Sequence, residues 1–253
     1  MPDKRTAKVI SITNTKAECR DCTLRELCLP LGLSETELNA FDRLKKRQRM
    51  LRKGELLYRY GDPLKSLYAI RSGAVKTTGL MEDGRIQVTG FCLPGEMLGI
   101  DAINDDRHPC SAEALEITEV CDIPYLALEA LAQEVPGLQH QLLRIMSQEI
   151  VRDEQMLMML GRMSAEERLA SCLISFSRRH ARLGRNGAEF KLSMSRQDLG
   201  DYLGLALETV SRLFTRFQDE GLISVRGRHI LLRSLDRLQA LASGGAGGRS
   251  VHA

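Results

Sequence analysis

The first half of the chain carries its apolar residues in short runs separated by glycines. The runs are rich in aliphatic and aromatic residues, as at 55–58, 66–70 and 87–91. The glycines between them recur about every ten residues, at Gly54, Gly61, Gly73, Gly84 and Gly95. Turn signals at this spacing are typical of consecutive short strands. We therefore predict an all-β roll or barrel of the jelly-roll type from about Leu38 to Ala127.

A helical period replaces this pattern after Pro136 and Gly137, which suit a helix start. We predict one long helix over 136–163, because the chain has no further glycine or proline until Gly161. Its core positions alternate by three and four residues, and one of them is charged: Leu143, Met146, Ile150, Asp153, Leu157 and Leu160. Such a seam is typical of two helices that pair as a coiled coil. The alternative is an amphipathic helix packed on its own domain; we favour a dimer helix, because the helix is long and the seam narrow.

A third pattern near the C-terminus predicts two short helices and a hairpin. Ser195 and Asp198 form an acidic capping box that begins a helix, and Gly204 ends it where a tight turn fits. A second helix is expected over about 207–220. The runs 222–225 and 229–232 flank the basic tip Arg226-Gly-Arg228 and suggest a hairpin that contacts phosphates. This order is the helix-turn-helix pattern, followed by a wing.

The second of these helices has two distinct faces. Its apolar stripe is Val210, Leu213, Phe214 and Phe217. A polar face lies elsewhere, with Glu208, Ser211, Arg212 and Thr215 at helical spacing. Arginine can hold guanine with two hydrogen bonds, glutamate can accept from cytosine, and serine can bond to several base edges. An ordinary solvated surface is the alternative, but the flanking elements favour DNA reading.

Charge supports this reading of the C-terminal third. From Ser164 onward the chain has 14 Lys and Arg against 9 Asp and Glu, whereas the remainder is slightly acidic. A basic part on an acidic body suggests contact with a polyanion. Residues 1–16 lack the apolar stretch of a signal peptide, and no apolar run reaches the roughly 20 residues of a membrane helix. We therefore expect a cytoplasmic protein that does not enter membranes.

Three of the seven cysteines lie within ten residues, as Cys19, Cys22 and Cys28. Thiolates this close can bind zinc or an iron–sulfur cluster, and the leucines around them could shield such a site. Both kinds of site usually take four ligands, so one must come from elsewhere. The candidates are Cys92, Cys110, Cys121 and Cys172. Spacing does not choose among them, although the apolar neighbours of Cys172 indicate a core position.

Together these residues resemble the oxygen-sensing fumarate and nitrate reduction regulators (FNR), within the cAMP receptor protein superfamily. The resemblance spans Cys19 to about Leu232. Its most specific passages are 64–73, 165–170 and 202–212. It implies an α+β protein of five parts: a cluster-binding segment at 1–35, a sensory β-roll at 36–135, a dimerisation helix at 136–163, a winged helix-turn-helix at 164–238 and a disordered tail at 239–253.

The resemblance also implies roles for individual residues. An oxygen-labile 4Fe–4S cluster would be held by Cys19, Cys22, Cys28 and Cys121. The base-reading positions fall on Glu208, Ser211 and Arg212, with Thr209 beside them, and the expected target is a palindrome of TTGAT half-sites. Met146, Ile150, Asp153 and Leu157 would form the dimer switch, in which Asp153 opposes a homodimer until the cluster binds. The implied partners are DNA and RNA polymerase.

Other functions remain to be weighed against this one. A nucleotide-responsive regulator of the same fold would carry an Arg-Ser pair in the β-roll, and the corresponding stretch here reads Arg107-His-Pro-Cys-Ser111. A zinc-stabilised regulator, or an adaptor without a DNA target, fits the cysteines but leaves the polar face unexplained. The sequence has no nucleophile-plus-base motif, phosphate-binding glycine loop or metalloprotease motif, so we expect no enzyme. Cys92 and Cys110 have no assigned role.

Overall fold

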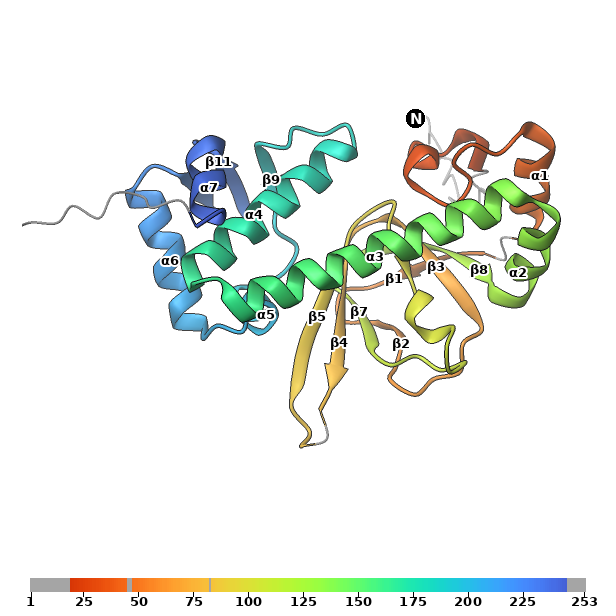
Figure 1. The fold of residues 1–253 in the computed structure, drawn as a ribbon, viewed down its shortest axis with the longest axis horizontal. Coiled ribbons are helices and arrows are strands. Elements are labelled where there is room, and N and C mark those ends of the chain that lie inside the picture. Colours follow the sequence, from red (N-terminus) through yellow and green to blue (C-terminus); the bar gives the residue numbers. More distant parts are fainter. Residues whose placement is uncertain (1–18, 45–46, 82, 245–253) are drawn as a thin grey trace, which may run out of the picture.

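The computed structural model describes residues 19–44, 47–81 and 83–244. A single long helix joins an N-terminal segment and a β-roll at one end to a helical domain at the other (Figure 1). Residues 1–16 and the end of the expected tail, 245–253, lie outside the described residues. None of the helices in the described ranges is both long and apolar enough to cross a membrane.

The β-roll consists of two four-stranded sheets whose paired strands are all antiparallel. One sheet has the order β1-β8-β3-β6 and the other β2-β7-β4-β5. The strands are β1 (Arg47–Leu51), β2 (Leu56–Tyr58), β3 (Ser66–Ser72), β4 (Val75–Leu80), β5 (Ile86–Cys92), β6 (Met97–Leu98), β7 (Ser111–Ala114) and β8 (Thr118–Pro124). Leu51, Ile70, Val75 and Val120 belong to one buried core with residues of both sheets. The predicted roll is thus confirmed.

Two helices flank the roll where the sequence reading expected strands. Helix α1 (Glu35–Leu44) precedes the first strand, and α2 (Tyr125–Glu134) follows the last. The expected all-β span of 38–127 is therefore too wide at both ends. The start of α1 had a local signal that was missed, since Ser34 and Glu37 form a capping box: the Ser34 amide donates to Glu37 Oε2 at 2.7 Å.

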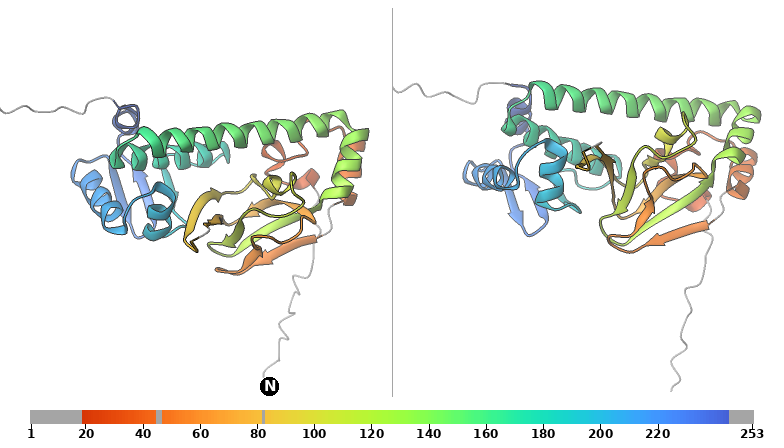
Figure 2. Two further views of the ribbon diagram at one scale, coloured as in Figure 1. Left: turned by 60° about the horizontal axis from the view of Figure 1, so that its bottom comes forward. Right: turned by 90° about the horizontal axis from the view of Figure 1, so that it is seen from below.

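Helix α3 (Pro136–Arg162) matches the predicted dimer helix within one residue. It lies along one side of the molecule, and its outer face is not covered by other elements (Figure 2). The N-terminal segment, residues 19–33, contains η1 (Cys19–Asp21) and η2 (Arg25–Leu27) and packs near the start of α3. Leu29 and Leu33 share a buried cluster there with Leu138 of α3.

The C-terminal domain has the predicted helix-turn-helix and wing. Its elements are α4 (Ala165–Arg182), β9 (Glu189–Lys191), α5 (Arg196–Leu203), α6 (Leu207–Asp219), β10 (Ile223–Arg226), β11 (His229–Leu232) and α7 (Leu235–Ala242). Ser195 caps α5 through a box with Asp198, and Gly204 ends α5 with a φ of +64°. The expected start of the tail at 239 is too early, because α7 continues to Ala242 and buries Leu238.

The β-roll and the C-terminal domain of one protomer pack directly together. Their buried side chains form one cluster, in which the rings of Phe91 and Tyr202 lie 5.0 Å apart. At the rim, Lys76 Nζ of β4 donates to Asp198 Oδ1 of α5 at 2.9 Å. Asp198 therefore both caps the first helix of the helix-turn-helix and ties it to the β-roll.

Candidate functional site

The structure brings four cysteines to one pocket, which we call the thiol pocket. Cys19, Cys22, Cys28 and Cys121 all line it, and its volume is about 30 Å³. Leu24, Phe41 and Ile123 provide apolar walls, and Arg25 and Arg71 also border it. Burial raises the free energy of thiolates, whereas nearby guanidinium groups lower it. The pocket thus combines four sulfur donors with positive charge.

Three of the four cysteines are each positioned by a different local contact. Cys19 begins η1, and its amide donates to both oxygens of Asp42 in α1, at 2.9 and 3.1 Å. Cys28 follows η2, and its carbonyl oxygen accepts from Gln141 Nε2 of α3 at 3.4 Å. Cys121 lies in the middle of β8, paired with strands on both sides. The sheet therefore supplies a rigid fourth position.

The pocket also corrects one expectation. Four leucines were expected to shield the cysteines, namely Leu24, Leu27, Leu29 and Leu31. Of these, only Leu24 lines the thiol pocket. Leu27 and Leu31 border a separate pocket on the other side of the segment.

Within the described ranges, no three His, Cys, Asp or Glu side chains are arranged to hold a metal ion. The donor set has the chemistry of a thiolate-held metal centre.

Helix α6 presents the predicted polar face to solvent. Glu208, Ser211 and Arg212 are exposed, whereas Thr209 is half-buried. The apolar stripe on the opposite face is fully buried, as expected: Val210, Leu213, Phe214 and Phe217. Arg196 of α5 stacks over the Phe214 ring and joins the two helices, and burial lowers the pKa of Arg196 to about 10.

Arg168 fixes the turn of this motif, a role that the sequence reading missed. Its guanidinium donates to the carbonyl oxygens of Leu160 at 2.8 Å and Leu203 at 2.9 Å. These groups belong to the last turns of α3 and α5, where helices leave carbonyl oxygens unpaired. At the wing, Arg226 and Arg228 are both exposed, but Arg228 donates to the carbonyl oxygen of Ser193 at 2.9 Å. Arg226 is therefore the better placed to contact phosphate.

The seam of α3 is open to solvent in the single protomer. Leu143, Ile150 and Leu157, which are spaced by seven, are 58%, 59% and 71% exposed. Met146 is half-buried, and Asp153 is exposed beside Ile150 and Leu157. Partial burial raises the pKa of Asp153, an effect that Arg152 opposes and Asp101 of the β-roll increases. A monomer rarely exposes such a regular apolar row.

Comparison with known proteins decides the family. Residues 48–135 match the cyclic nucleotide-binding domain family, and residues 167–241 match the Crp-like helix-turn-helix domain family. The chain is 47% identical to the transcriptional activator protein Anr of Pseudomonas protegens over 93% of its length and 96% of that protein. It is 43% identical to the fumarate and nitrate reduction regulatory protein of Escherichia coli, over 96% and 97%. The chain belongs to the FNR family of transcription regulators.

A solved structure supports the same assignment. FixK2 from Bradyrhizobium japonicum superposes on this FNR-family chain with a TM-score of 0.71 and 34% identity, covering 77% of the chain and 96% of FixK2. The two share the Crp/Fnr fold of an N-terminal β-sandwich, a long helix and a C-terminal helix-turn-helix. The predicted family and fold class are therefore confirmed.

The remaining cysteines of this FNR-family chain lie outside the thiol pocket. Cys92 and Cys172 are buried, and burial raises the pKa of each thiol to about 12. Burial also raises the pKa of Cys110, helped by Asp101, to which its Sγ donates at 3.2 Å. Thiols with raised pKa values are poor metal ligands, because the thiolate is the ligand.

The stretch Arg107–Ser111 contributes buried side chains to the interior of the β-roll. His108 is buried, and its ring stacks on Tyr58 with centroids 3.7 Å apart. Cys110 lies on the same side of the roll, in contact with Asp101. These side chains occupy the interior beside Arg107–Ser111, where the sequence also lacks an Arg-Ser pair.

Proposed function

We propose that this FNR-family chain is an oxygen-responsive, sequence-specific transcription regulator of the cytoplasm. The observation that carries the proposal is the meeting of Cys19, Cys22, Cys28 and Cys121 in one pocket. These four thiolates would hold a 4Fe–4S cluster, which when bound supplies an oxygen-labile link among them. Three of the ligands belong to a short segment and the fourth to a strand, so ligation would fix the segment to the β-roll.

The same segment contacts α3, so ligation of the cysteines would act on the helix that carries the seam. Gln141 of α3 donates to the Cys28 carbonyl oxygen, and Leu29 and Leu33 pack against the start of α3. Fixing the segment would therefore fix the first turns of α3. The exposed apolar row further along α3 would then pair with its copy in a homodimer.

Asp153 opposes that pairing in the proposed mechanism. It lies between Ile150 and Leu157, so it would approach its own copy across the dimer axis. Two carboxylates that lose water side by side repel each other, and burial disfavours their charge. Ligation at the thiol pocket would supply the free energy that outweighs this repulsion. Oxygen, by destroying the link, would return the protein to monomers.

The dimer would read a palindrome with two copies of α6. Glu208, Ser211 and Arg212 would contact base edges, with Thr209 beside them, in half-sites resembling TTGAT. Two-fold symmetry in the protein sets the spacing of the half-sites. DNA and RNA polymerase are the proposed partners.

Replacement of single cysteines tests the ligand set. Each of the seven is changed to Ser in the full chain, and iron and acid-labile sulfide are measured after anaerobic purification. We expect losses for Cys19, Cys22, Cys28 and Cys121, and a full complement for Cys92, Cys110 and Cys172. A full complement in Cys121→Ser, together with a loss in Cys92→Ser or Cys110→Ser, would refute the fourth ligand.

Zinc is the second candidate for the thiol pocket, since four cysteine ligands also suit a structural zinc site. The same purification separates the two: a brown protein with sulfide supports the cluster, and a colourless protein with one zinc supports the alternative. The lack of an Arg-Ser pair in the stretch Arg107–Ser111 argues against the nucleotide-responsive alternative.

A further inference from the structure

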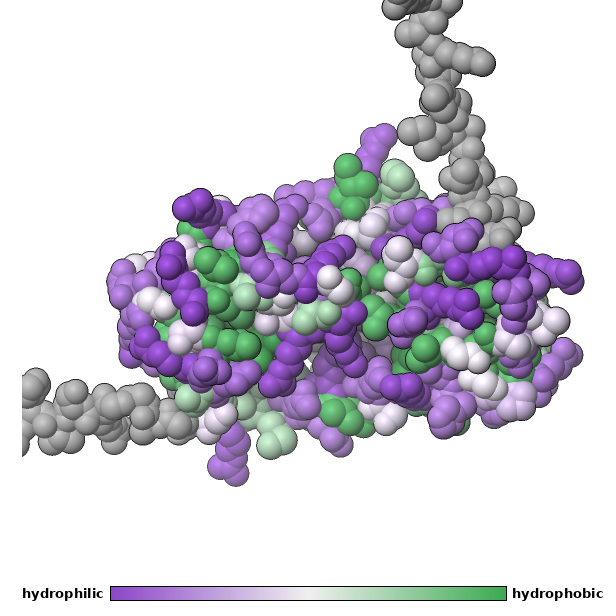
Figure 3. Space-filling view, turned by 90° about the horizontal axis from the view of Figure 1, so that it is seen from above, coloured by the Kyte–Doolittle hydropathy of each residue, from purple (hydrophilic) through white to green (hydrophobic). Residues whose placement is uncertain are grey.

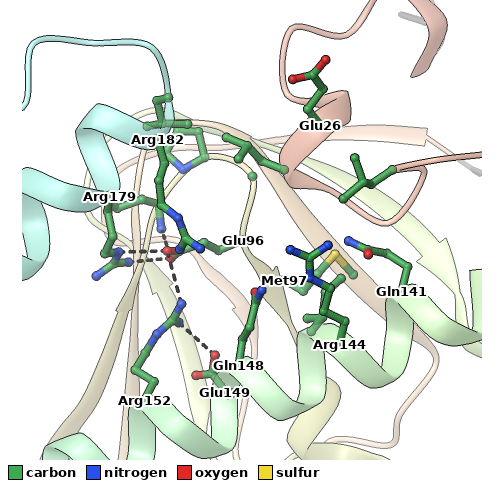
Figure 4. Close-up of a pocket in the computed structure, with 17 residues that line it drawn as sticks. Glu26, Glu96, Met97, Gln141, Arg144, Gln148, Glu149, Arg152, Arg179 and Arg182 are labelled. Carbon is green, nitrogen blue, oxygen red and sulfur yellow. Dashed lines mark hydrogen bonds and ion pairs between the residues drawn. The ribbon is translucent and has the colours of Figure 1, made fainter.

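A second pocket lies where all the parts of the protomer meet. It is lined by residues of the N-terminal segment, the loop 93–97 of the β-roll, α3 and the end of α4, and its volume is about 140 Å³ (Figure 4). Four arginines surround it: Arg144, Arg152, Arg179 and Arg182. We call it the arginine pocket. From above, the middle of the molecule, where the C-terminal domain approaches the N-terminal segment, is largely hydrophilic (Figure 3).

Two of these arginines are already neutralised. Arg179 donates to both carboxylate oxygens of Glu96, at 2.8 and 2.5 Å, and Arg152 lies between Glu96 and Glu149. Burial alone would raise the pKa of Glu96, but Arg179 and Arg152 hold it below its usual value. These ion pairs form one wall of the pocket (Figure 4).

The other two arginines are not neutralised. Arg144 and Arg182 form no ion pair or hydrogen bond with the residues that the structure describes. They come from different elements, α3 and α4, and both border the same pocket. The amides of Gln141 and Gln148 add further hydrogen-bonding groups from α3. The pocket therefore has unused capacity for an anion, because arginine forks match phosphate oxygens in pairs.

Apart from the carboxylate of Glu26, the rest of the lining is apolar. Leu27 and Leu31 of the N-terminal segment, Leu93 of the β-roll loop and Leu183 after α4 border the pocket. An inorganic ion would leave this surface unused, whereas a molecule with an acidic group and an apolar body would cover it. We propose that the arginine pocket binds a small organic phosphate, with the phosphate held by Arg144 and Arg182.

The pocket stays accessible when the seam of α3 is covered. Successive residues of a helix are turned by about 100°. Ile150 of the seam and Arg152 of the pocket are two residues apart, so they point in nearly opposite directions. The pocket therefore lies on the inner side of α3, away from a partner that packs on Leu143, Ile150 and Leu157.

Binding here would act on the cysteines through their own segment. Leu24, Arg25 and Cys28 line the thiol pocket, whereas Glu26, Leu27 and Leu31 line the arginine pocket. A ligand bridging Arg144 and Arg182 would hold this segment between α3 and α4. Coupling of this kind is reciprocal, so occupation of either pocket would change the affinity of the other by the same factor. The binding itself does not depend on which metal the thiol pocket holds.

Calorimetric titration with phenyl phosphate tests the proposal. The full-length chain is titrated as purified without oxygen, and again after removal of metal. We expect one site per protomer in both preparations, and weaker binding of inorganic phosphate. The double variant Arg144→Gln/Arg182→Gln should weaken phenyl phosphate binding at least tenfold, about 1.4 kcal/mol or more. Arg178→Gln is the matched control, because Arg178 is exposed on α4 outside the pocket.

One further variant and one further probe make the result decisive. Arg212→Gln removes an exposed arginine from the polar face of α6, and citrate offers carboxylates in place of phosphate. Weakened binding in Arg212→Gln with normal binding in the double variant would place the anion on the DNA-reading face and overturn the proposal. Absence of binding, or binding of citrate but not phenyl phosphate, would overturn it as well.

Discussion

Arg179 of α4 and Glu96 of the β-roll form a two-pronged ion pair that joins the C-terminal domain to the β-roll, with both side chains less than one-fifth exposed. Glu96→Gln would leave the Arg179 charge buried beside a neutral group. Loss of one partner of a buried pair costs about 3–5 kcal/mol. We expect a loss of this size in the free energy of unfolding, measured by calorimetry.

A surface pair in the same roll is the control for that measurement. Asp83 and Arg85 also form an ion pair, but their side chains are 52% and 73% exposed. Asp83→Asn should change stability by less than about 1 kcal/mol, because exposed pairs contribute little. Equal effects of Glu96→Gln and Asp83→Asn would show that the interdomain pair contributes no more to the free energy of unfolding than an exposed pair does.

Assembly should depend on pH through Asp153. Partial burial raises the pKa of this carboxyl above 3.8, with Asp101 adding to the rise and Arg152 opposing it. A carboxyl with a raised pKa binds a proton more readily in the folded protein, so the protonated form is favoured there and repulsion grows as pH rises through this pKa. Oxygen-exposed protein should therefore dimerise more at acidic pH, near this raised pKa, than at neutral pH, as measured by sedimentation.

Variants at two positions separate Asp153 from its neighbour. Burial raises the pKa of Glu149 too, and Glu149 lies one turn earlier on α3. Asp153→Asn should dimerise at both pH values, and Asp153→Ala should dimerise and bind its palindrome in air. Glu149→Gln should keep the pH dependence of the wild type. If Asp153→Asn and the wild type respond to pH alike, Asp153 does not oppose the dimer.

Gly95 should hold the N-terminal segment close to the roll. Its φ is +87°, and a Cβ there would lie 3.0 Å from Leu27 Cβ. Gly54 has a φ of +81° with open space around it. Both Ala variants carry backbone strain of roughly 1–2 kcal/mol. Only Gly95→Ala should also push the N-terminal segment outward. Under the proposed ligation, this variant should therefore lose the visible absorbance of its iron–sulfur cluster faster in air than Gly54→Ala does. Equal rates of loss would contradict this contact.

Arg212 and Arg226 should differ in how they contribute to DNA binding. Arg212→Ala removes an exposed group that is proposed to read a base, so we expect about 1–3 kcal/mol less discrimination at one base pair. Arg226→Ala at the wing should weaken all sequences alike and lower the salt dependence. Titration of the palindrome and its single-base variants at several salt concentrations measures both. A uniform loss for Arg212→Ala would make it a phosphate contact.

Thiol reactivity should separate the two sets of cysteines. Burial raises the pKa of Cys92 and Cys172 to about 12, so they remain thiols at neutral pH. The thiolate is the reactive form. In metal-free protein, iodoacetamide should modify Cys22, which is half-exposed, well before these two, as followed by mass spectrometry. Modification of Cys92 as fast as Cys22 would contradict its buried position.

The parts of the fold that local chemistry determines were predictable from sequence. Helices α5 and α6 and the wing lie within one residue of expectation, because Ser195, Asp198 and Gly204 form local capping signals. Helix α1 was missed although Ser34 and Glu37 carry the same kind of signal. The apolar runs that follow this segment have the pattern of strands and made its helix start less visible in the sequence.

Contacts across the chain could not be read in the same way. Spacing did not select Cys121 as the fourth thiol; the family resemblance did, and the structure places it with the trio. The pairs Lys76–Asp198 and Glu96–Arg179 join residues 122 and 83 positions apart. Their partners depend on how two domains pack, and periodicity carries no information about that. The arginine pocket could not be predicted from the sequence for the same reason, because its lining comes from four separate parts of the chain.

The distribution of the four thiols along the chain has a consequence for the sensor domain itself. Cys19, Cys22 and Cys28 are neighbours, so joining them closes only short loops, whereas Cys121 lies about 90 residues further on. Under the proposed ligation, the bond to Cys121 encloses nearly the whole β-roll in one covalent ring and removes conformational freedom from its unfolded chain. Oxygen would then open a ring as well as separate a dimer. The sensor domain without its cluster should be a less stable fold and an easier target for proteases, so the same event that silences the regulator would also shorten its life.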